Sequence, residues 1–166
     1  MNYFIYKVVR FIGRPIYKIV FRPKYYGVDN IPSEGAVILA GNHTNNLDAA
    51  MMIGAPKRIE HMMAKKELFS SKISNYFFRS MGCISVNRSI HDESAKMKAL
   101  EVLNNGGAIG IFPEGTRNKT KQKLLPFKFG AVSMANKTNA TIVPIAITGH
   151  YKFRSKDLKI KVGIPF

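Results

Sequence analysis

Residues 36–48 read AVILAGNHTNNLD, and this stretch decides the fold. Its first five residues are apolar without a helical period, which predicts a short buried strand. The polar residues 42–46 follow as a loop, and residues 47–54 continue as a predicted helix. A buried strand that passes through a polar loop into a helix is the unit from which α/β sheets are built.

The same alternation continues along the chain. Four more short apolar runs predict strands, and three further segments predict helices. The strands are expected at residues 83–86, 108–112, 142–147 and 158–164, and the helices at 65–80, 92–104 and 127–138. This order predicts an α/β fold with a mostly parallel central sheet covered by helices.

The composition bounds the size of the protein and the nature of its partners. With 166 residues and a single cysteine, Cys83, the chain is expected to form a core without disulfides or a structural metal. Lys and Arg outnumber Asp and Glu 26 to 10, which gives a formal net charge of +16. Such a balance indicates a polyanionic partner: nucleic acid, an anionic bilayer or a phosphorylated substrate.

The N-terminal segment is amphipathic. On a helix, the five cations of residues 3–22 would fall within a sector of about 120°, and Phe, Ile, Val and Tyr fill most of the remaining surface. This layout is typical of an interfacial helix; the alternative is an ordinary amphipathic helix packed on its own domain. Gly13 and Pro15 are expected to break the segment into two short helices. We therefore predict an interfacial helical segment at 1–24 and an α/β domain at 25–166.

The hydrophobic pattern bears on how the chain would meet a membrane. No apolar run reaches the roughly 20 residues that span a bilayer. The N-terminal cations also interrupt any signal-peptide pattern. The chain is therefore expected to lie on a membrane surface or to stay soluble, without crossing a membrane.

Polar residues follow four of the predicted strands. They are Asn42-His43, Asn87-Arg88, Pro113–Arg117 and Thr148–His150. In open parallel sheets, ligands bind outside the carboxyl ends of the strands. We expect these groups to lie along one edge of the sheet, and their convergence there predicts an active site.

His43 and Asp48 form the first candidate pair. A separation of five residues is about 140° around a helix, so the two side chains would not share a helical face. They meet if His43 lies in the turn and Asp48 in the first helical turn. The carboxylate would then fix the tautomer of the imidazole and stabilise its protonated form, as in a general base. The alternative is a loop histidine with Asp48 capping a helix.

The segment FPEGTR (112–117) offers a tight turn, an acid and a guanidinium directly after a buried strand. The guanidinium of Arg117 is suited to bind a phosphate through two parallel hydrogen bonds. Alternatively, this turn is a surface loop in which Glu114 pairs with Arg117.

Four blocks of sequence together resemble the ordered motifs of the glycerolipid acyltransferase family, whose best-known members are the PlsC-like 1-acyl-glycerol-3-phosphate acyltransferases. The blocks are NHTNNLD (42–48), GCISVNR (82–88), FPEGTR (112–117) and VPIAI (143–147), and the resemblance extends over residues 25–165. Two positions depart from the family pattern, since Asn45 and Asn118 stand where Ser is usual. These departures leave the acceptor preference open.

The resemblance implies roles for individual residues. His43 matches the family's general base and Asp48 its partner. The positions that the resemblance assigns to binding the acceptor substrate are Arg88, Glu114, Gly115, Thr116 and Arg117. Family members use acyl-CoA or acyl-carrier protein as donor and require no metal, so no cofactor is expected.

The reaction implied is transfer of a fatty acyl group from an acyl thioester to the free hydroxyl of 1-acyl-glycerol-3-phosphate, which forms phosphatidic acid in phospholipid biosynthesis. His43 would remove the hydroxyl proton, while Arg88 and Arg117 would bind the acceptor phosphate. The alternatives are another lysolipid or glycerol-3-phosphate as acceptor, or a non-catalytic basic membrane-binding protein. Cys83 as a covalent acyl carrier is a further route, although its place inside a predicted strand favours a small core residue.

The expected partners are an anionic membrane surface, a lysophospholipid acceptor, and acyl-CoA or acyl-carrier protein. The expected location is the cytoplasmic face of the membrane, with peripheral or monotopic attachment. Nucleic acid is not expected, because the cations concentrate in the N-terminal segment and near the motif loops. The sequence also carries no helix-turn-helix, zinc-finger or RNP-type signature.

Overall fold

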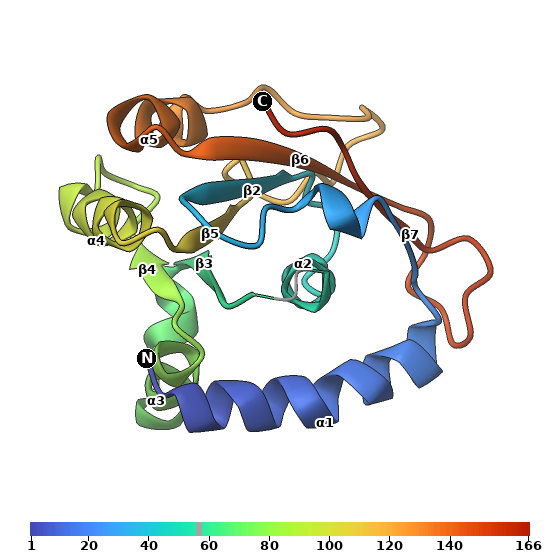
Figure 1. The fold of residues 1–166 in the computed structure, drawn as a ribbon. Coiled ribbons are helices and arrows are strands. Elements are labelled where there is room, and N and C mark those ends of the chain that lie inside the picture. The colour runs from blue at the N-terminus through green and yellow to red at the C-terminus, as the bar shows by residue number, and fades with distance from the viewer. Residues whose placement is uncertain (56–57) are drawn as a thin grey trace.

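The sheet is built around β2 (Val37–Gly41), which corresponds to the strand predicted at residues 36–40. In the computed structural model, which describes residues 1–55 and 58–166, the sheet has seven strands in the order β1-β7-β6-β2-β5-β3-β4. Helices lie on both faces of this sheet (Figure 1). The predicted α/β fold with a mostly parallel, helix-covered sheet is confirmed.

Five neighbouring strands of the sheet run parallel, from β6 through β2, β5 and β3 to β4. β7 pairs antiparallel with β6, and β1 pairs parallel with β7. The bounds are β1 (Lys24–Tyr26), β3 (Glu60–Lys65), β4 (Ile84–Val86), β5 (Ala108–Ile111), β6 (Thr141–Thr148) and β7 (Lys159–Val162). The carboxyl ends of the five parallel strands therefore lie along one edge, where ligands bind in such sheets.

Two apolar layers sandwich the sheet, and β2 contributes to both. Val37 and Leu39 pack on the side of α2 (Asp48–Gly54), whereas Ile38 packs against α4 (Glu93–Asn104) and α5 (Gly130–Thr138). Because successive side chains of a strand point to opposite faces, one short apolar run supplies both layers. The positions of the strand ends are thereby fixed by a core on each side.

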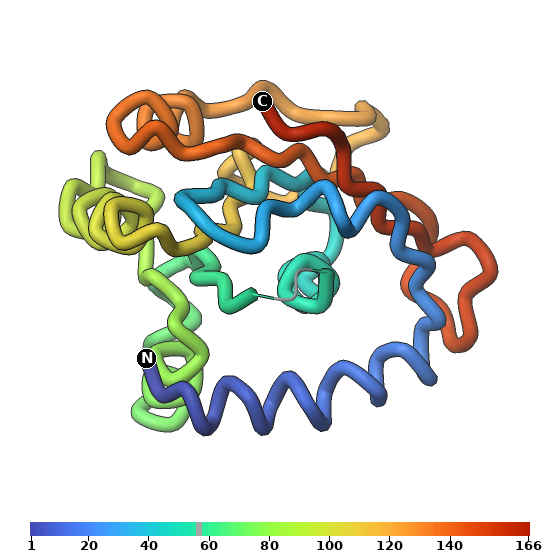
Figure 2. The backbone as a smooth tube through the Cα atoms, viewed as in Figure 1, coloured from blue at the N-terminus to red at the C-terminus, as the bar shows by residue number. Residues whose placement is uncertain are grey.

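The N-terminal segment forms one helix, α1 (Tyr3–Phe21), so the predicted break at Gly13 and Pro15 is wrong. Figure 2 shows it as a continuous, gently curved coil below the rest of the domain. A proline in a helix interior costs roughly 3 kcal/mol. Here the side chain of Asn2 caps the first turn and the buried Tyr6 anchors the helix to the domain, which together with the other packed residues outweighs that cost.

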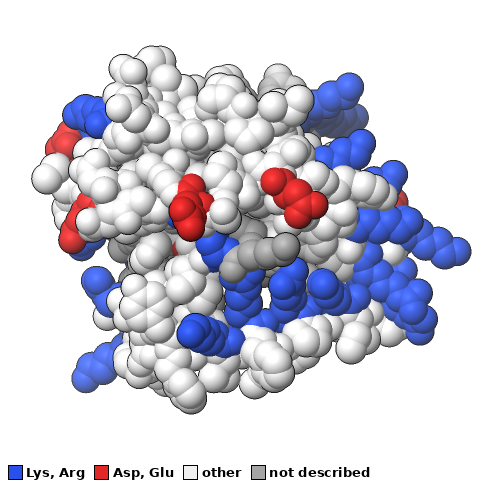
Figure 3. Space-filling view, in the orientation of Figure 1, with Lys and Arg blue, Asp and Glu red and all other residues white. Residues whose placement is uncertain are grey.

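An apolar face of α1 points away from the domain. Its exposed residues, with their exposed fractions, are Phe4 (75%), Phe11 (82%), Ile12 (53%), Ile16 (54%) and Ile19 (68%). Lys and Arg side chains gather over α1 and toward the end of the molecule where β7 lies (Figure 3). No helix within the described residues is long and apolar enough to cross a membrane. The membrane contact of this segment and the boundary at residue 24 stay predictions.

The region before β4 differs from its prediction. In place of a helix over 65–80, a 3₁₀ turn (Lys66–Phe69) is followed by α3 (Lys72–Ser80), which Ser71 caps. β3 was not predicted, because its first residue is the charged Glu60, which is completely buried. β1 and the 3₁₀ turn Val28–Asn30 were also absent from the prediction.

Candidate active site

The polar motifs converge at the carboxyl edge of the parallel strands, as predicted. Asn42-His43 follows β2, the FPEGTR segment follows β5, and Asn87-Arg88 follows β4. Strands β2 and β5 are hydrogen-bonded neighbours, so the first and third motifs lie side by side. The side chain of Asn42 ties β2 to β6 by exchanging two hydrogen bonds with the backbone of Ile147.

His43 and Asp48 contact each other, with 3.0 Å between His43 Nδ1 and Asp48 Oδ2. Asp48 is the first residue of α2 and is completely buried. Its Oδ2 also accepts hydrogen bonds from the backbone N–H groups of Thr44 and Asn45, both 2.7 Å away. The turn between β2 and α2 thus folds around the carboxylate, which is the arrangement that the five-residue spacing requires.

The imidazole of His43 is oriented on two sides. The carboxylate at Nδ1 favours the tautomer with the proton on that nitrogen, so Nε2 carries the basic lone pair. The ring stacks on Phe112, with 4.0 Å between the ring centroids and 9° between the planes. Its side chain is 11% exposed, which leaves a route for a reactant to reach it. Chemically, the pair is a base held in one orientation by a buried anion.

Glu114 fastens the third motif to the first. Its Oε1 accepts the backbone N–H of His43 at 2.8 Å, and its Oε2 accepts that of Leu125 at 2.9 Å. The backbone N–H of Asn118 donates to the carbonyl of His43 at 2.7 Å. The carboxylate of Glu114 is therefore engaged within the protein and does not pair with Arg117 in the manner of the alternative surface loop. Its predicted role in binding substrate stays a prediction.

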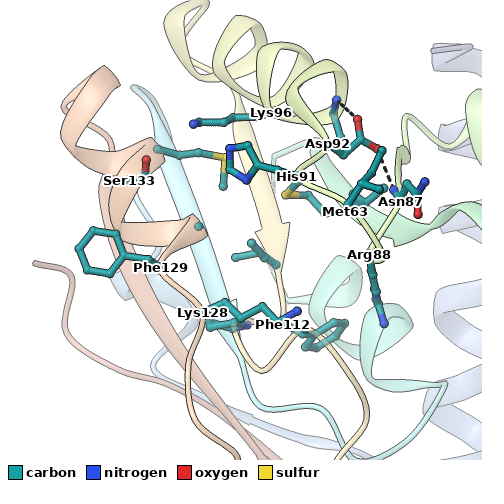
Figure 4. A pocket seen from close by; sticks show the side chains of 18 residues that line it. Met63, Asn87, Arg88, His91, Asp92, Lys96, Phe112, Lys128, Phe129 and Ser133 are labelled. Carbon is teal, nitrogen blue, oxygen red and sulfur yellow. Dashed lines mark hydrogen bonds between the residues drawn. The ribbon is translucent and has the colours of Figure 1, made fainter.

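A cavity of about 480 Å³ opens beside the His43–Asp48 pair, between the loops that follow β4 and β5 (Figure 4). Phe112 lines the cavity on one side and stacks on His43, so one aromatic ring separates the cavity from the imidazole. Much of the remaining wall is apolar, with Met63, Ile111 and Met134 among its residues. An elongated apolar group with a polar end fits a wall of this kind.

Three of the residues that line the cavity are cationic. Arg88, Lys96 and Lys128 line it, and Figure 4 shows Arg88 and Lys128 extending toward the end where Phe112 lies. Burial lowers the pKa of Arg88, while the charge of Glu67 opposes that shift. Gly115 has a φ of +69°, and a Cβ there would lie 2.7 Å from Cε of Lys128. Glycine therefore lets this cation pack against the turn of the third motif.

The structure brings only part of the predicted acceptor-binding set to the cavity. Arg88 and Gly115 line it. Thr116 is exposed and Arg117 half-buried in the loop that follows, and neither belongs to the described cavity wall. The binding roles of these residues are predictions that the geometry leaves open.

Sequence reasoning did not single out several residues of this region. Lys96 lines the cavity, but a single lysine on a helix carries no motif. Lys65 ends the unpredicted β3 at the same edge of the sheet. The hydroxyl of Tyr151 donates a hydrogen bond to Asp48 Oδ1 from the loop after β6, 103 residues away in sequence, and no local pattern marks such a contact.

Cys83 is poorly suited to act as a nucleophile. Burial raises the pKa of its thiol to about 12, and the nearby charge of Glu60 adds to the shift. A thiol that stays protonated is a poor nucleophile. Among the described residues, no group of three or more His, Cys, Asp or Glu side chains is arranged to hold a metal ion.

The chain is similar in sequence to known acyltransferases. The family model described as Acyltransferase matches residues 22–148. The chain is 36% identical over 140 residues to a 1-acyl-sn-glycerol-3-phosphate acyltransferase of Borreliella burgdorferi, covering 83% of this chain and 56% of that protein. It is 31% identical over 147 residues to one of Bacillus subtilis, covering 86% of this chain and 72% of the relative.

A solved structure is also similar. The crystal structure of the 1-acyl-sn-glycerophosphate acyltransferase PlsC from Thermotoga maritima matches with a TM-score of 0.76 and 25% sequence identity. The match covers 97% of this chain and 68% of that one. The chain thus spans between about half and three quarters of the length of these relatives.

Proposed function

The chain belongs to the acyltransferase family, and from this premise we propose that it transfers a fatty acyl group from an acyl thioester to the free hydroxyl of 1-acyl-sn-glycerol-3-phosphate. The product would be phosphatidic acid. The observation that carries the proposal is the 3.0 Å contact between His43 and the fully buried Asp48 at the sheet edge. The similarity to 1-acyl-sn-glycerol-3-phosphate acyltransferases supports the choice of acceptor.

In the proposed mechanism, His43 acts as general base through Nε2. It removes the proton from the acceptor hydroxyl while that oxygen attacks the thioester carbonyl carbon. The tetrahedral intermediate then expels the thiolate by breaking the carbon–sulfur bond, and the protonated imidazole returns its proton to the sulfur. Asp48 stabilises the imidazolium between these steps, and general-base help of this kind contributes roughly 10²–10⁴-fold to the rate.

The acceptor would be aligned by its phosphate. Arg88 reaches the cavity and Arg117 follows the same turn as Gly115, so both are suited to approach a phosphate near His43. Holding the phosphate fixes the hydroxyl relative to the base, which converts binding energy into orientation. Gly115 has no side chain of its own, so Lys128 packs against its backbone and could meet a phosphate that approaches this turn.

The donor would be acyl-CoA or acyl-carrier protein, both of which carry negative charge. Residues 117–128 form a loop rich in exposed cations next to the third motif; these are Lys119, Lys121, Lys123 and Lys128, with Arg117 half-buried. Their positive potential favours a phosphorylated or acidic donor. The two donors can be separated only by offering each to the protein.

A membrane surface would supply the lipid acceptor. The exposed face of α1 is apolar, and Lys7, Lys18 and Arg22 lie beside it. α3 adjoins the same helix and exposes Ile73 (85%) and Tyr76 (64%). Apolar side chains flanked by cations are the composition of a helix that binds the interface of an anionic bilayer. We therefore propose that the enzyme binds peripherally to a membrane surface, and its location on the cytoplasmic face stays a prediction.

The test of the proposed reaction is a donor-by-acceptor panel with the purified protein. Acyl-CoA and acyl-carrier protein are each combined with 1-acyl-sn-glycerol-3-phosphate, another lysophospholipid and glycerol-3-phosphate in anionic vesicles, and products are identified by mass spectrometry. Phosphatidic acid formed from 1-acyl-sn-glycerol-3-phosphate is the expected result. Transfer to a different acceptor alone would reassign the substrate, and no transfer in any combination would overturn the enzymatic function.

A further inference from the structure

A tyrosine outside the four motifs contacts the candidate dyad. The hydroxyl of Tyr151 donates a hydrogen bond to Asp48 Oδ1, the oxygen that does not face His43. The other oxygen, Oδ2, serves His43 Nδ1 and the N–H groups of Thr44 and Asn45. Each carboxylate oxygen thus has its own donors, and together they fix the rotation of the carboxylate about its Cβ–Cγ bond.

Tyr151 is suited to be a permanent donor. Burial raises the pKa of its hydroxyl, and the hydrogen bond to Asp48 and the charge of that carboxylate raise it further. The phenol therefore keeps its proton throughout the neutral range. An anionic partner also strengthens the hydrogen bond relative to one between neutral groups.

The ring of Tyr151 is held from the opposite side by α1. It meets the ring of Phe21 edge to face, with 5.8 Å between the ring centroids and 82° between the planes. The backbone N–H of Arg154, in the same loop, donates to the carbonyl of Val20 in the last turn of α1. The loop after β6 consequently spans from the end of the N-terminal helix to the active-site carboxylate.

The loop that carries Tyr151 is internally braced. His150 Nδ1 lies 2.6 Å from Asp157 Oδ2, and the hydroxyl of Ser155 donates to Asp157 Oδ1 at 2.7 Å. Hydrogen bonds from Ser155 and His150 lower the pKa of Asp157, so it stays an acceptor. Gly149 has a φ of +93°, and a Cβ there would collide with the carbonyl oxygen of Asp157. The side chains of His150 and Asp157 are 70% and 53% exposed, so this pair lies on the outer surface of the loop.

From these contacts we propose that Tyr151 is a positioning residue of the active site: it holds Asp48 so that Oδ2 faces His43. The inference rests on the proposed acyl-transfer function for its effect on rate, but the orientation itself is a property of the folded chain. Tyr151 touches Asp48 and not the reacting atoms, so it acts through the dyad. Loss of its hydroxyl alone should disturb the dyad and leave substrate binding unchanged.

The experiment compares Tyr151→Phe with Tyr6→Phe. The first removes only the hydroxyl and keeps the ring that packs on Phe21. The second removes another buried tyrosine hydroxyl, which accepts the backbone N–H of Glu60 far along the sheet from the dyad, and so controls for lost stability. For each protein, the resonance of the His43 Nδ1 proton is recorded by NMR, and kcat and KM are measured separately with the donor and acceptor that the panel identifies.

In Tyr151→Phe we expect the His43 Nδ1 proton resonance to move and kcat to fall roughly tenfold, equivalent to about 1.4 kcal/mol of transition-state stabilisation, with KM within about twofold. Tyr6→Phe should leave both readouts at the wild-type values. An unmoved resonance in Tyr151→Phe, or a moved resonance with wild-type kcat, would overturn the positioning role. If the resonance moves but the wild-type protein transfers no acyl group, the orientation holds and the proposed function fails instead.

Discussion

Replacing Asp48 by asparagine separates a catalytic carboxylate from one that merely caps α2. Four donors face this carboxylate in the structure: two backbone N–H groups, a tyrosine hydroxyl and the His43 ring. An amide has one oxygen, and its nitrogen cannot face the two N–H groups without repulsion. In the Asp48→Asn variant, the amide oxygen should therefore take the Oδ2 position, leaving the amide nitrogen toward Tyr151, whose hydroxyl can turn to accept.

The expected magnitudes follow from these contacts. The backbone hydrogen bonds survive but become bonds to a neutral acceptor, and since charged acceptors contribute about 1.5–3 kcal/mol against about 1 kcal/mol for neutral ones, we expect a stability loss of about 1–3 kcal/mol. The negative charge that stabilises the imidazolium disappears entirely. Acyl transfer should therefore fall by much of the roughly 10²–10⁴-fold that a general base contributes.

The assay measures initial rates of phospholipid formation and urea unfolding for the wild type, Asp48→Asn and Asp29→Asn. Asp29 lies exposed in the turn Val28–Asn30 and provides the same change of charge away from the site. Only Asp48→Asn should lose activity while remaining folded. A folded Asp48→Asn variant with near wild-type turnover would show that Asp48 only caps the helix, and the general-base reasoning would be refuted.

Three other perturbations test separate parts of the account. Arg88→Ala should lower kcat/KM for a phosphorylated acceptor about 10- to 100-fold, as expected for one lost charge-assisted contact. Arg117→Ala should lower it less, because Arg117 does not belong to the described cavity wall. Equal kcat/KM values in both variants and the wild type would remove these roles. Burial raises the pKa of Glu60 from 4.5 to about 8, against the charge of Arg10, so the unfolded chain releases a proton that the folded chain retains. The free energy of unfolding should therefore fall as the pH rises from 4.5 to 8. Measured by urea unfolding, the free energy of Glu60→Gln should depend less on pH over this range. The same pH dependence in both proteins would contradict a buried neutral carboxyl at Glu60. Phe11→Glu should weaken the affinity for anionic vesicles, measured by sedimentation, roughly tenfold or more. Val132→Glu, on α5, should leave that affinity unchanged. Equal binding of the two variants would exclude α1 as the membrane contact.

The sequence was sufficient for the features that depend on local pattern. The apolar run before Asn42 predicted the central strand, and the order of strands and helices predicted the parallel edge where His43 and the FPEGTR turn meet. The spacing of His43 and Asp48 allowed a contact if Asp48 lay in the first turn of a helix, and the structure has that contact. These inferences needed only periodicity and the geometry of parallel sheets.

The errors arise where distant contacts override local preference. Pro15 signals a break, yet α1 continues because packing of residues such as Tyr6 holds the helix on the domain. β3 was not predicted because it begins with Glu60, and a carboxyl inside a buried strand is rare. The burial of Glu60 depends on α1 and the sheet together. Tyr151 reaches Asp48 from the loop between β6 and β7, which pair antiparallel. None of these contacts leaves a mark within a short window of sequence.

The most direct test of the central claim is acyl transfer by His43→Ala. Purified wild-type and variant proteins are compared for formation of phosphatidic acid from an acyl thioester and 1-acyl-sn-glycerol-3-phosphate, with circular dichroism and vesicle sedimentation as checks on folding and membrane binding. His61→Gln serves as the matched histidine control, since that ring contacts the carbonyl of Gly82 away from the dyad. We predict that His43→Ala loses transfer while keeping its fold and its binding to vesicles. Turnover equal to that of the wild type would contradict the assignment of His43 as the base.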